Sequence, residues 1–143
     1  MLELSRESAE KSNMHTAYKG FAITSVETKQ HERALAYIIK AEEYLPFVEG
    51  VLYHVDHHLL KAQILSELDQ TTKALEEVSI AEQKLPKDQL NNSTGFGLSI
   101  LRYKSQFFGE LGQYQKAYEI GKEYIEGYIE NRTVEKDQSV SKL

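Results

Sequence analysis

One nine-residue pattern occurs three times along this chain. It reads Glu-x-x-Gln-x-x-[Arg/Lys]-Ala-[Leu/Tyr], and its copies begin at Glu27, Glu67 and Glu110. The first two copies also share Ala-Glu and Leu-Pro dipeptides at matching downstream positions, within 41–46 and 81–86. An internal repeat of this kind is typical of a stack of similar units, in which each unit packs against its neighbours. The repeat therefore predicts a stack, and it favours a binding function over a catalytic one.

Each copy of the pattern lies between two stretches with helical periodicity. Apolar residues recur at i, i+4, i+7 and i+11, as in Ala34, Ile38, Ala41 and Leu45, which is the spacing of one buried helix face. Both prolines follow a leucine at the end of such a stretch, and sustained period-2 alternation is missing, so the chain is predicted to be all-α. The expected helices form three pairs, at 14–26 and 32–45, at 52–68 and 71–85, and at 98–111 and 115–130.

A small residue begins the buried stripe of each second helix. Paired antiparallel helices approach closely only where the facing side chains are small. The expected crossing residues are Ala34, Ala74 and Ala117 on the second helices, with Ala22, Ala62 and Ser105 facing them on the first helices.

These features resemble the tetratricopeptide repeat (TPR) family, whose consensus reads W-x₂-L-G-x₂-Y…A-x₃-F…P. The passage Leu111-Gly112-Gln-Tyr114-Gln-Lys-Ala117 is the most similar to it. The resemblance covers roughly residues 14–130 and implies a right-handed α-solenoid of three TPR-like helical hairpins plus an N-terminal helix. Its units are expected at 14–46, 52–86 and 98–130, within a repeat domain that spans 1–130.

The repeat spacing departs from that family. Ala34 and Ala74 are 40 residues apart, and Ala74 and Ala117 are 43 apart, whereas the family period is 34. Lengthened units of this kind look like the TPR-like regions of bacterial regulatory proteins, namely sensor kinases, diguanylate cyclases and peptide-sensing transcription regulators. The resemblance therefore implies a segment of a larger bacterial signalling protein.

Both ends of the chain suggest a piece of a longer protein. Residues 2–11 look like the second helix of a preceding unit that lacks its first helix. Residues 131–143 form a polar C-terminal extension without the polar cap that ends most repeat stacks, so we expect them to lead to a domain absent from this chain.

Composition limits the classes of partner. The net charge is −5, from 17 basic and 22 acidic residues that are interspersed, which argues against a nucleic-acid surface. The N-terminus is too polar for a signal peptide, and no apolar run reaches membrane-spanning length, so no membrane contact is expected. Without cysteine there is no disulfide framework, which fits the cytoplasm and leaves the bacterial periplasm open. We expect a cytoplasmic protein.

One run of residues resembles a metal site in its composition. His54, Asp56, His57 and His58 lie within five positions, and His54 and His58 share a helix face. A zinc site needs a third ligand, and no His-Glu-x-x-His motif or cysteine cluster supplies one. We therefore interpret these residues as solvated or interhelical histidines, with His58 in place of a bulky aromatic residue.

No other motif carries recognisable chemistry. The glycine- and amide-rich segment 91–97 lacks the Gly-Lys-[Ser/Thr] end of a phosphate loop and is predicted to be a connector. The sequence predicts no catalytic residue, no cofactor and no metal.

The concave face formed by the first helices is the expected binding groove. It mixes cations, an acid, amides and apolar residues: Lys19, Ile23, Asp56, Leu59, Gln63, Arg102 and Gln106. TPR domains that hold chaperone tails clamp a terminal carboxylate with Lys, Asn and Arg. Here Ile23 stands where the first Asn would be, which excludes that partner class.

The predicted function is therefore a non-catalytic interaction or sensory segment whose groove binds a protein or peptide. The alternative is a structural module for self-association, in which Tyr118, Tyr124 and Tyr128 pack against another copy to form a homodimer. An enzymatic function would rest on the histidines alone and is the weakest of the three.

Overall fold

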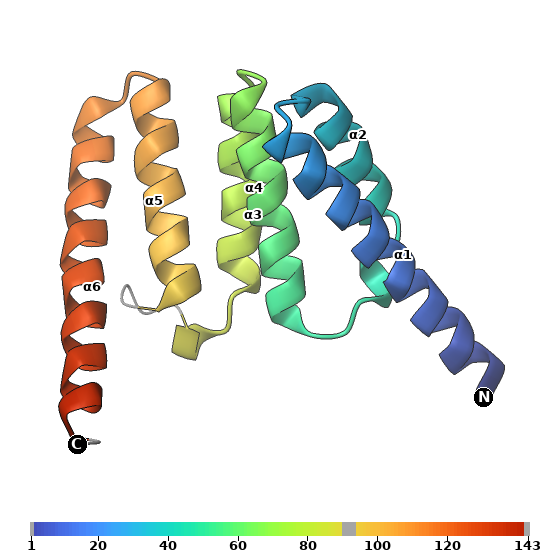
Figure 1. Ribbon diagram of the computed structural model, residues 1–143. Helices are drawn as coiled ribbons and strands as arrows, with labels where there is room; N and C mark the ends of the chain where they lie inside the picture. The colour runs from blue at the N-terminus through green and yellow to red at the C-terminus, as the bar shows by residue number, and fades with distance from the viewer. Residues whose placement is uncertain (1, 90–93, 142–143) are drawn as a thin grey trace. The chain divides into compact units, whose positions relative to one another are not determined.

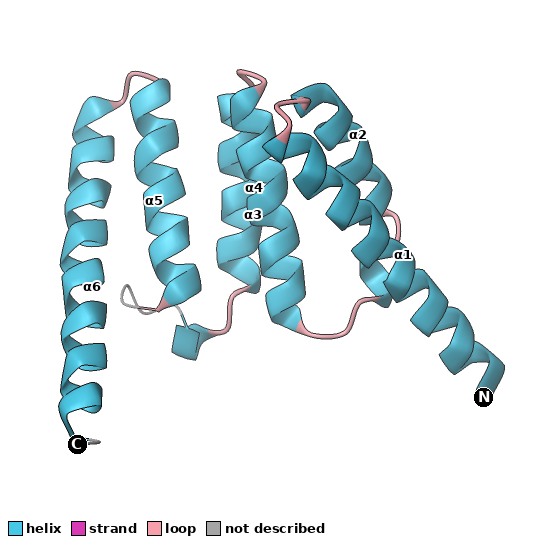
Figure 2. Ribbon diagram, in the orientation of Figure 1, coloured by secondary structure: helices cyan, strands magenta, loops and turns pink. Residues whose placement is uncertain are grey.

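The described part of the chain is mostly helical. The computed structural model describes residues 2–89 and 94–141, and within these ranges it contains no strand (Figures 1 and 2). The α-helices are α1 (Leu2–Glu27), α2 (His31–Glu42), α3 (Val51–Glu67), α4 (Thr71–Lys84), α5 (Gly95–Glu110) and α6 (Tyr114–Ser141). Two 3₁₀ turns, η1 (Leu45–Phe47) and η2 (Lys87–Gln89), follow α2 and α4. The prediction of an all-α fold is confirmed.

The helices pack as three sequential hairpins, α1 with α2, α3 with α4, and α5 with α6. The chain divides into two compact units, Met1–Lys84 and Leu85–Leu143. The first unit contains two hairpins, which meet where α2 packs on α3. The second unit contains the hairpin of α5 and α6.

The repeated pattern forms the turn of each hairpin. Its third position, occupied by Lys29, Asp69 or Gly112, has a positive φ of 60°, 60° or 77°. This left-handed residue ends the first helix. The repeated glutamine then closes the turn, because its backbone N–H donates to the preceding helix, at 2.7 Å from Gln30 to Ser25, for example. Its carbonyl in turn accepts from the repeated alanine, at 2.9–3.0 Å in all three copies.

Four of the six small residues expected at the helix crossings are fully buried. Ala34 and Ala22 are fully buried in one cluster with Ile38 and Ile64. Ala62 and Ala74 are also fully buried. The contact between α5 and α6 differs, because it includes a polar side chain.

At that crossing, the Ser105 hydroxyl donates to the carbonyl of Ala117 at 2.8 Å. A Cβ added at Gly121 would stand 3.0 Å from the same hydroxyl, so glycine allows the close approach there. Ala117 itself is half-buried.

The prediction for residues 2–11 is wrong. They continue without a break into α1 instead of forming a separate N-terminal helix. Residues 11–14 contain neither glycine nor proline, so nothing in the sequence ends the helix there.

Helix ends also differ by a few residues from the expected ones. α2 stops at Glu42, and the 3₁₀ turn η1, which has Pro46 as its second residue, follows it. α5 begins at Gly95 after Thr94, whose hydroxyl accepts from the Gly97 N–H at 3.2 Å. Of the predicted connector, residues 91–93 lie outside the described residues. The polar segment from 131 onward is helical as far as Ser141.

Within the described part of the chain, no helix combines the length and the apolar character that crossing a membrane requires.

A larger side chain at the first crossing should destabilise the protein. Ala34→Leu adds volume to a site with no exposed surface, and overpacking of this kind costs about 1–3 kcal/mol. Ala36→Leu is the matched control, because Ala36 is exposed on the same helix. Urea unfolding followed by circular dichroism should show a lower midpoint for Ala34→Leu alone. Equal midpoints for the two variants would contradict the predicted crossing.

Two glycine replacements should shift stability in opposite directions. Gly112→Ala forces alanine into a left-handed conformation and should destabilise the fold by about 1 kcal/mol. Gly20→Ala lies inside α1 with no atom near the added Cβ, so helix propensity should stabilise the fold by about 0.5–1 kcal/mol. Thermal melting of both variants beside the parent chain measures the difference. Shifts of the same sign would refute the assigned turn.

Candidate functional site

Six ionisable side chains from all four helices of the first unit converge between the helices. We call them the histidine–glutamate cluster. Its members are His15 of α1, Glu42 of α2, His57, His58 and Lys61 of α3, and Glu77 of α4. The three histidines are buried, with 3%, 0% and 7% of their surfaces exposed, and the other three residues are half-buried.

Helix α3 places the cluster, since it packs on both α2 and α4. His57 and Lys61 are one turn apart and both contact Glu42 of α2. His58 and Lys61 are three residues apart and both contact Glu77 of α4. The side chain of Lys61 therefore connects the two carboxylates.

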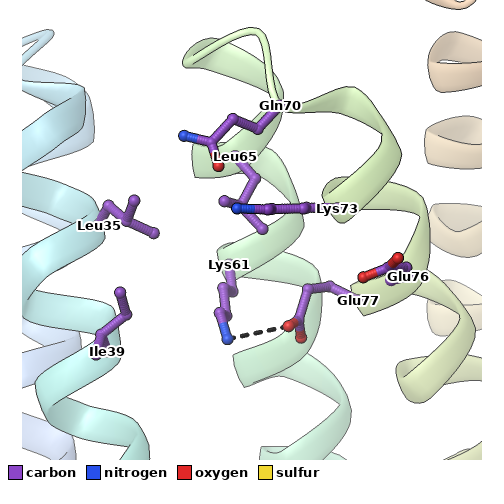
Figure 3. A pocket seen from close by; sticks show the side chains of 8 residues that line it. All are labelled: Leu35, Ile39, Lys61, Leu65, Gln70, Lys73, Glu76 and Glu77. Atoms are coloured by element: carbon purple, nitrogen blue, oxygen red, sulfur yellow. Dashed lines mark ion pairs between the residues drawn. The ribbon is translucent and has the colours of Figure 1, made fainter.

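The hydrogen bonds form a continuous chain. Glu42 Oε1 lies 3.2 Å from His57 Nε2, and His57 Nδ1 lies 3.1 Å from His15 Nε2. His58 Nδ1 is 2.7 Å from Glu77 Oε2. The Lys61 ammonium donates to Glu42 at 3.1 and 3.2 Å and pairs with Glu77 at 3.0 Å (Figure 3).

Carboxylates that are ionised only accept hydrogen bonds, and this determines where the imidazole protons lie. His57 donates through Nε2–H to Glu42, so a neutral His57 accepts at Nδ1 from the Nε2–H of His15. His58 donates through Nδ1–H to Glu77, which leaves the lone pair on Nε2 of a neutral His58.

The cluster favours ionised carboxylates and a neutral His15. A hydrogen bond from His57, assisted by Lys61, lowers the pKa of Glu42 to about 2. Burial opposes ionisation of Glu77, but hydrogen bonds from His58 and Lys61 outweigh it and lower the pKa of that carboxyl. Burial, together with the nearby His57 and Lys19, lowers the pKa of His15 to about 4. With neutral imidazoles, two carboxylates and one ammonium leave one negative charge in excess.

A cavity of about 270 Å³ borders the cluster (Figure 3). Lys61 and Glu77 line it together with apolar side chains of α2, Leu35 and Ile39. The rest of the lining comes from α3, α4 and the turn between them, namely Leu65, Gln70, Lys73 and Glu76. The cavity thus gives small solutes access to the polar side chains of α3 and α4.

The structure places the predicted groove residues in different environments. Lys19 and Asp56 do come together, as an ion pair between α1 and α3. Ile23 is exposed and Gln63 is half-buried, but Leu59 is only 6% exposed and so belongs to the core instead of an open groove.

The other two predicted groove residues lie in the second unit. Arg102 stands over the Tyr103 ring at 4.6 Å, and Gln106 donates to Glu110 at 3.0 Å.

His54 and His58, which share a helix face in the sequence, have different partners, because His54 Nε2 bonds to the carbonyl of Val48 at 2.8 Å. His57 and His58 contact carboxylates of other helices, as expected of interhelical histidines. Glu42, fifteen residues before His57 and on another helix, lies close to both histidines and was not singled out from the sequence. A weak signal existed, since Glu42 adjoins the buried stripe residue Ala41 just as Glu77 adjoins Val78.

A second feature is an exposed apolar stripe on α6, which we call the α6 stripe. It consists of Tyr114, Tyr118, Ile125 and Ile129, which are 74%, 68%, 56% and 58% exposed. Their spacing of four, seven and four residues places them on one helix face. Tyr128, named in the self-association alternative, is 43% exposed beside the stripe.

Comparison of the chain with protein-family models, with curated proteins and with solved structures gives no match. Function must therefore be inferred from the cluster, the cavity and the α6 stripe.

Acid should destabilise the fold partly through His15. Its pKa is about 4 in the folded state and 6.5 in an ordinary histidine, so the unfolded chain binds the proton more readily between these values. The stabilisation from neutral His15 is therefore complete above about pH 6.5 and is lost as the pH falls towards 4. The loss should be on the order of 2–3 kcal/mol.

His15→Gln keeps a hydrogen-bonding group that does not titrate, so urea unfolding across this pH range should show a flatter profile. His31→Gln, which removes a histidine that does not contribute to the pKa shift of His15, serves as the control and should keep the parent slope. If the free energy of unfolding of His15→Gln fell with pH as steeply as that of the parent chain, His15 would not be the source of the acid sensitivity.

Proposed function

We propose that this chain is a protein-interaction module that associates with a second copy of itself through α6. The observation that carries the proposal is the exposure of four large apolar side chains in one row. A row of this kind is costly to leave in water and is typical of a contact surface. The helical hairpins and the TPR resemblance support binding as the mode of action.

The spacing of the α6 stripe favours a second copy as the partner. The stripe is symmetric about a point between Gly121 and Lys122, because Tyr114 and Ile129 are equidistant from it, as are Tyr118 and Ile125. Two-fold association of identical helices places each residue opposite its mirror position. In an antiparallel pair, every tyrosine would therefore face an isoleucine of the other copy.

The flanks of the stripe fit the same arrangement. On one side α6 packs against α5, and the half-buried Ala117 and Gly121 lie there. On the far side lie exposed charged residues, among them Glu119, Glu123 and Glu126. The stripe is about 22 Å long at 1.5 Å per residue, so the contact would be small. Small interfaces bind weakly, and we expect a dissociation constant on the order of micromolar.

The binding groove predicted on the first helix of each hairpin has less support from the positions of its residues. Lys19 and Asp56 already pair with each other, and Leu59 is buried. Membership of a larger bacterial signalling protein stays a prediction.

Sedimentation velocity over a range of concentrations tests the proposal. The parent chain should shift from monomer to dimer as concentration rises, and Tyr118→Lys or Ile125→Glu should remain monomeric. Lys116→Glu is the control, because Lys116 is exposed on the opposite face of α6 and should not affect association. Circular dichroism confirms that each variant remains helical.

The double variant Tyr118→Lys/Ile125→Glu tests the register. In the antiparallel pair each lysine faces a glutamate of the other copy, so association should return relative to either single variant. In a parallel pair like charges would meet instead. A parent chain that stays monomeric at every concentration, or a double variant no better than the single ones, would refute the proposal.

A further inference from the structure

We propose that Glu42, His57 and His58 form a binding site for Zn²⁺, contrary to the prediction from sequence. Each residue offers one ligand atom, and the three atoms lie within 4.8 Å of one another. Two imidazole nitrogens and a carboxylate oxygen are a donor set that zinc prefers, with a fourth position left for water.

The distances require little rearrangement. Zinc–nitrogen and zinc–oxygen bonds of about 2.0–2.2 Å place tetrahedral ligand atoms roughly 3.4 Å apart. Glu42 Oε1 and His57 Nε2 already stand 3.2 Å apart. One ligand atom from each residue lies within 4.8 Å of the other two, so no pair exceeds that spacing by more than about 1.4 Å.

The surrounding hydrogen bonds are those of a metal-binding imidazole. Histidine ligands usually donate their other N–H to a carboxylate or another acceptor, which orients the ring. Glu77 accepts from Nδ1–H of His58, so Nε2 of His58 is available to a metal without further change. For His57 to bind through Nε2, its proton must move to Nδ1 and donate to His15. A neutral His15 can accept it at 3.1 Å.

Charge also favours a cation. The cluster has two carboxylates and one ammonium, and so carries one negative charge in excess when the imidazoles are neutral. Lys61 is the competitor, because its ammonium occupies both oxygens of Glu42. Binding would require Lys61 to release Glu42 and keep its 3.0 Å contact with Glu77. The site is therefore expected to be weaker than one without a lysine.

A cavity lies beside the proposed site and reaches two residues that contact its ligands. Lys61 and Glu77 line the cavity between α2, α3 and α4 (Figure 3), and both belong to the cluster. Because Glu42 lies on α2 and the histidines lie on α3, bound zinc would connect the two hairpins of the first unit. Binding to the folded state alone stabilises it, so the melting temperature should rise with zinc concentration.

Calorimetric titration of the metal-free full chain with ZnCl₂ at neutral pH tests the proposal. The parent chain should bind one ion, and Co²⁺ should give the visible absorption of a tetrahedral site. Glu42→Gln and His58→Asn should each weaken binding at least about tenfold. His54→Gln, on the same helix but outside the cluster, should bind as the parent does.

Lys61→Gln should bind zinc several-fold more tightly than the parent chain, because it removes the competing ammonium. Misfolding would weaken zinc binding and so cannot produce this result. Absence of saturable binding up to roughly 1 mM zinc in both the parent and Lys61→Gln would overturn the proposal. Equal zinc affinity in the parent and Glu42→Gln would overturn it as well, because Glu42 would then not be a ligand.

Discussion

Close approach of paired helices at small residues controls how these hairpins pack. Ala22 and Ala34 are fully buried in one cluster of α1 and α2, and a Cβ added at Gly121 of α6 would stand 3.0 Å from the Ser105 hydroxyl of α5. The repeated turn sets this crossing, because the left-handed residue and the glutamine that follows it reverse the chain a fixed number of residues before the alanine. The turn and the crossing are thus two consequences of one nine-residue pattern.

The histidine–glutamate cluster has a different energetic character. Apolar packing is non-directional, whereas buried charges need specific partners, and loss of one partner leaves the other desolvated and unpaired. In the first unit the same helix α3 supplies both kinds of contact, with Ile64 in the apolar cluster and Lys61 between two carboxylates. The polar contacts therefore restrict how the two hairpins of that unit can pack.

Helix α6 shows how one helix can have three faces. One face contacts α5 through Ala117 and Gly121, another is charged, and the third carries two tyrosines and two isoleucines in water. Tyr124, which the self-association alternative included, is half-buried. The isoleucines of the α6 stripe could not be recognised from the sequence, because periodicity identifies a face but not whether another helix covers it.

The helices and their pairing could be predicted from the amino-acid sequence, because helical periodicity and turn chemistry act over a few neighbouring positions. The helix boundary expected near residues 11–14 was wrong, because it was inferred from the repeat and not from a local signal that ends a helix. The contacts of Glu42 with His57 and of His54 with Val48 could not be predicted in this way. Those contacts join different helices or a helix and a loop, and they follow from how elements pack. The same holds for Leu59 in the core and Tyr118 in water, because exposure is a property of the neighbours that folding brings together.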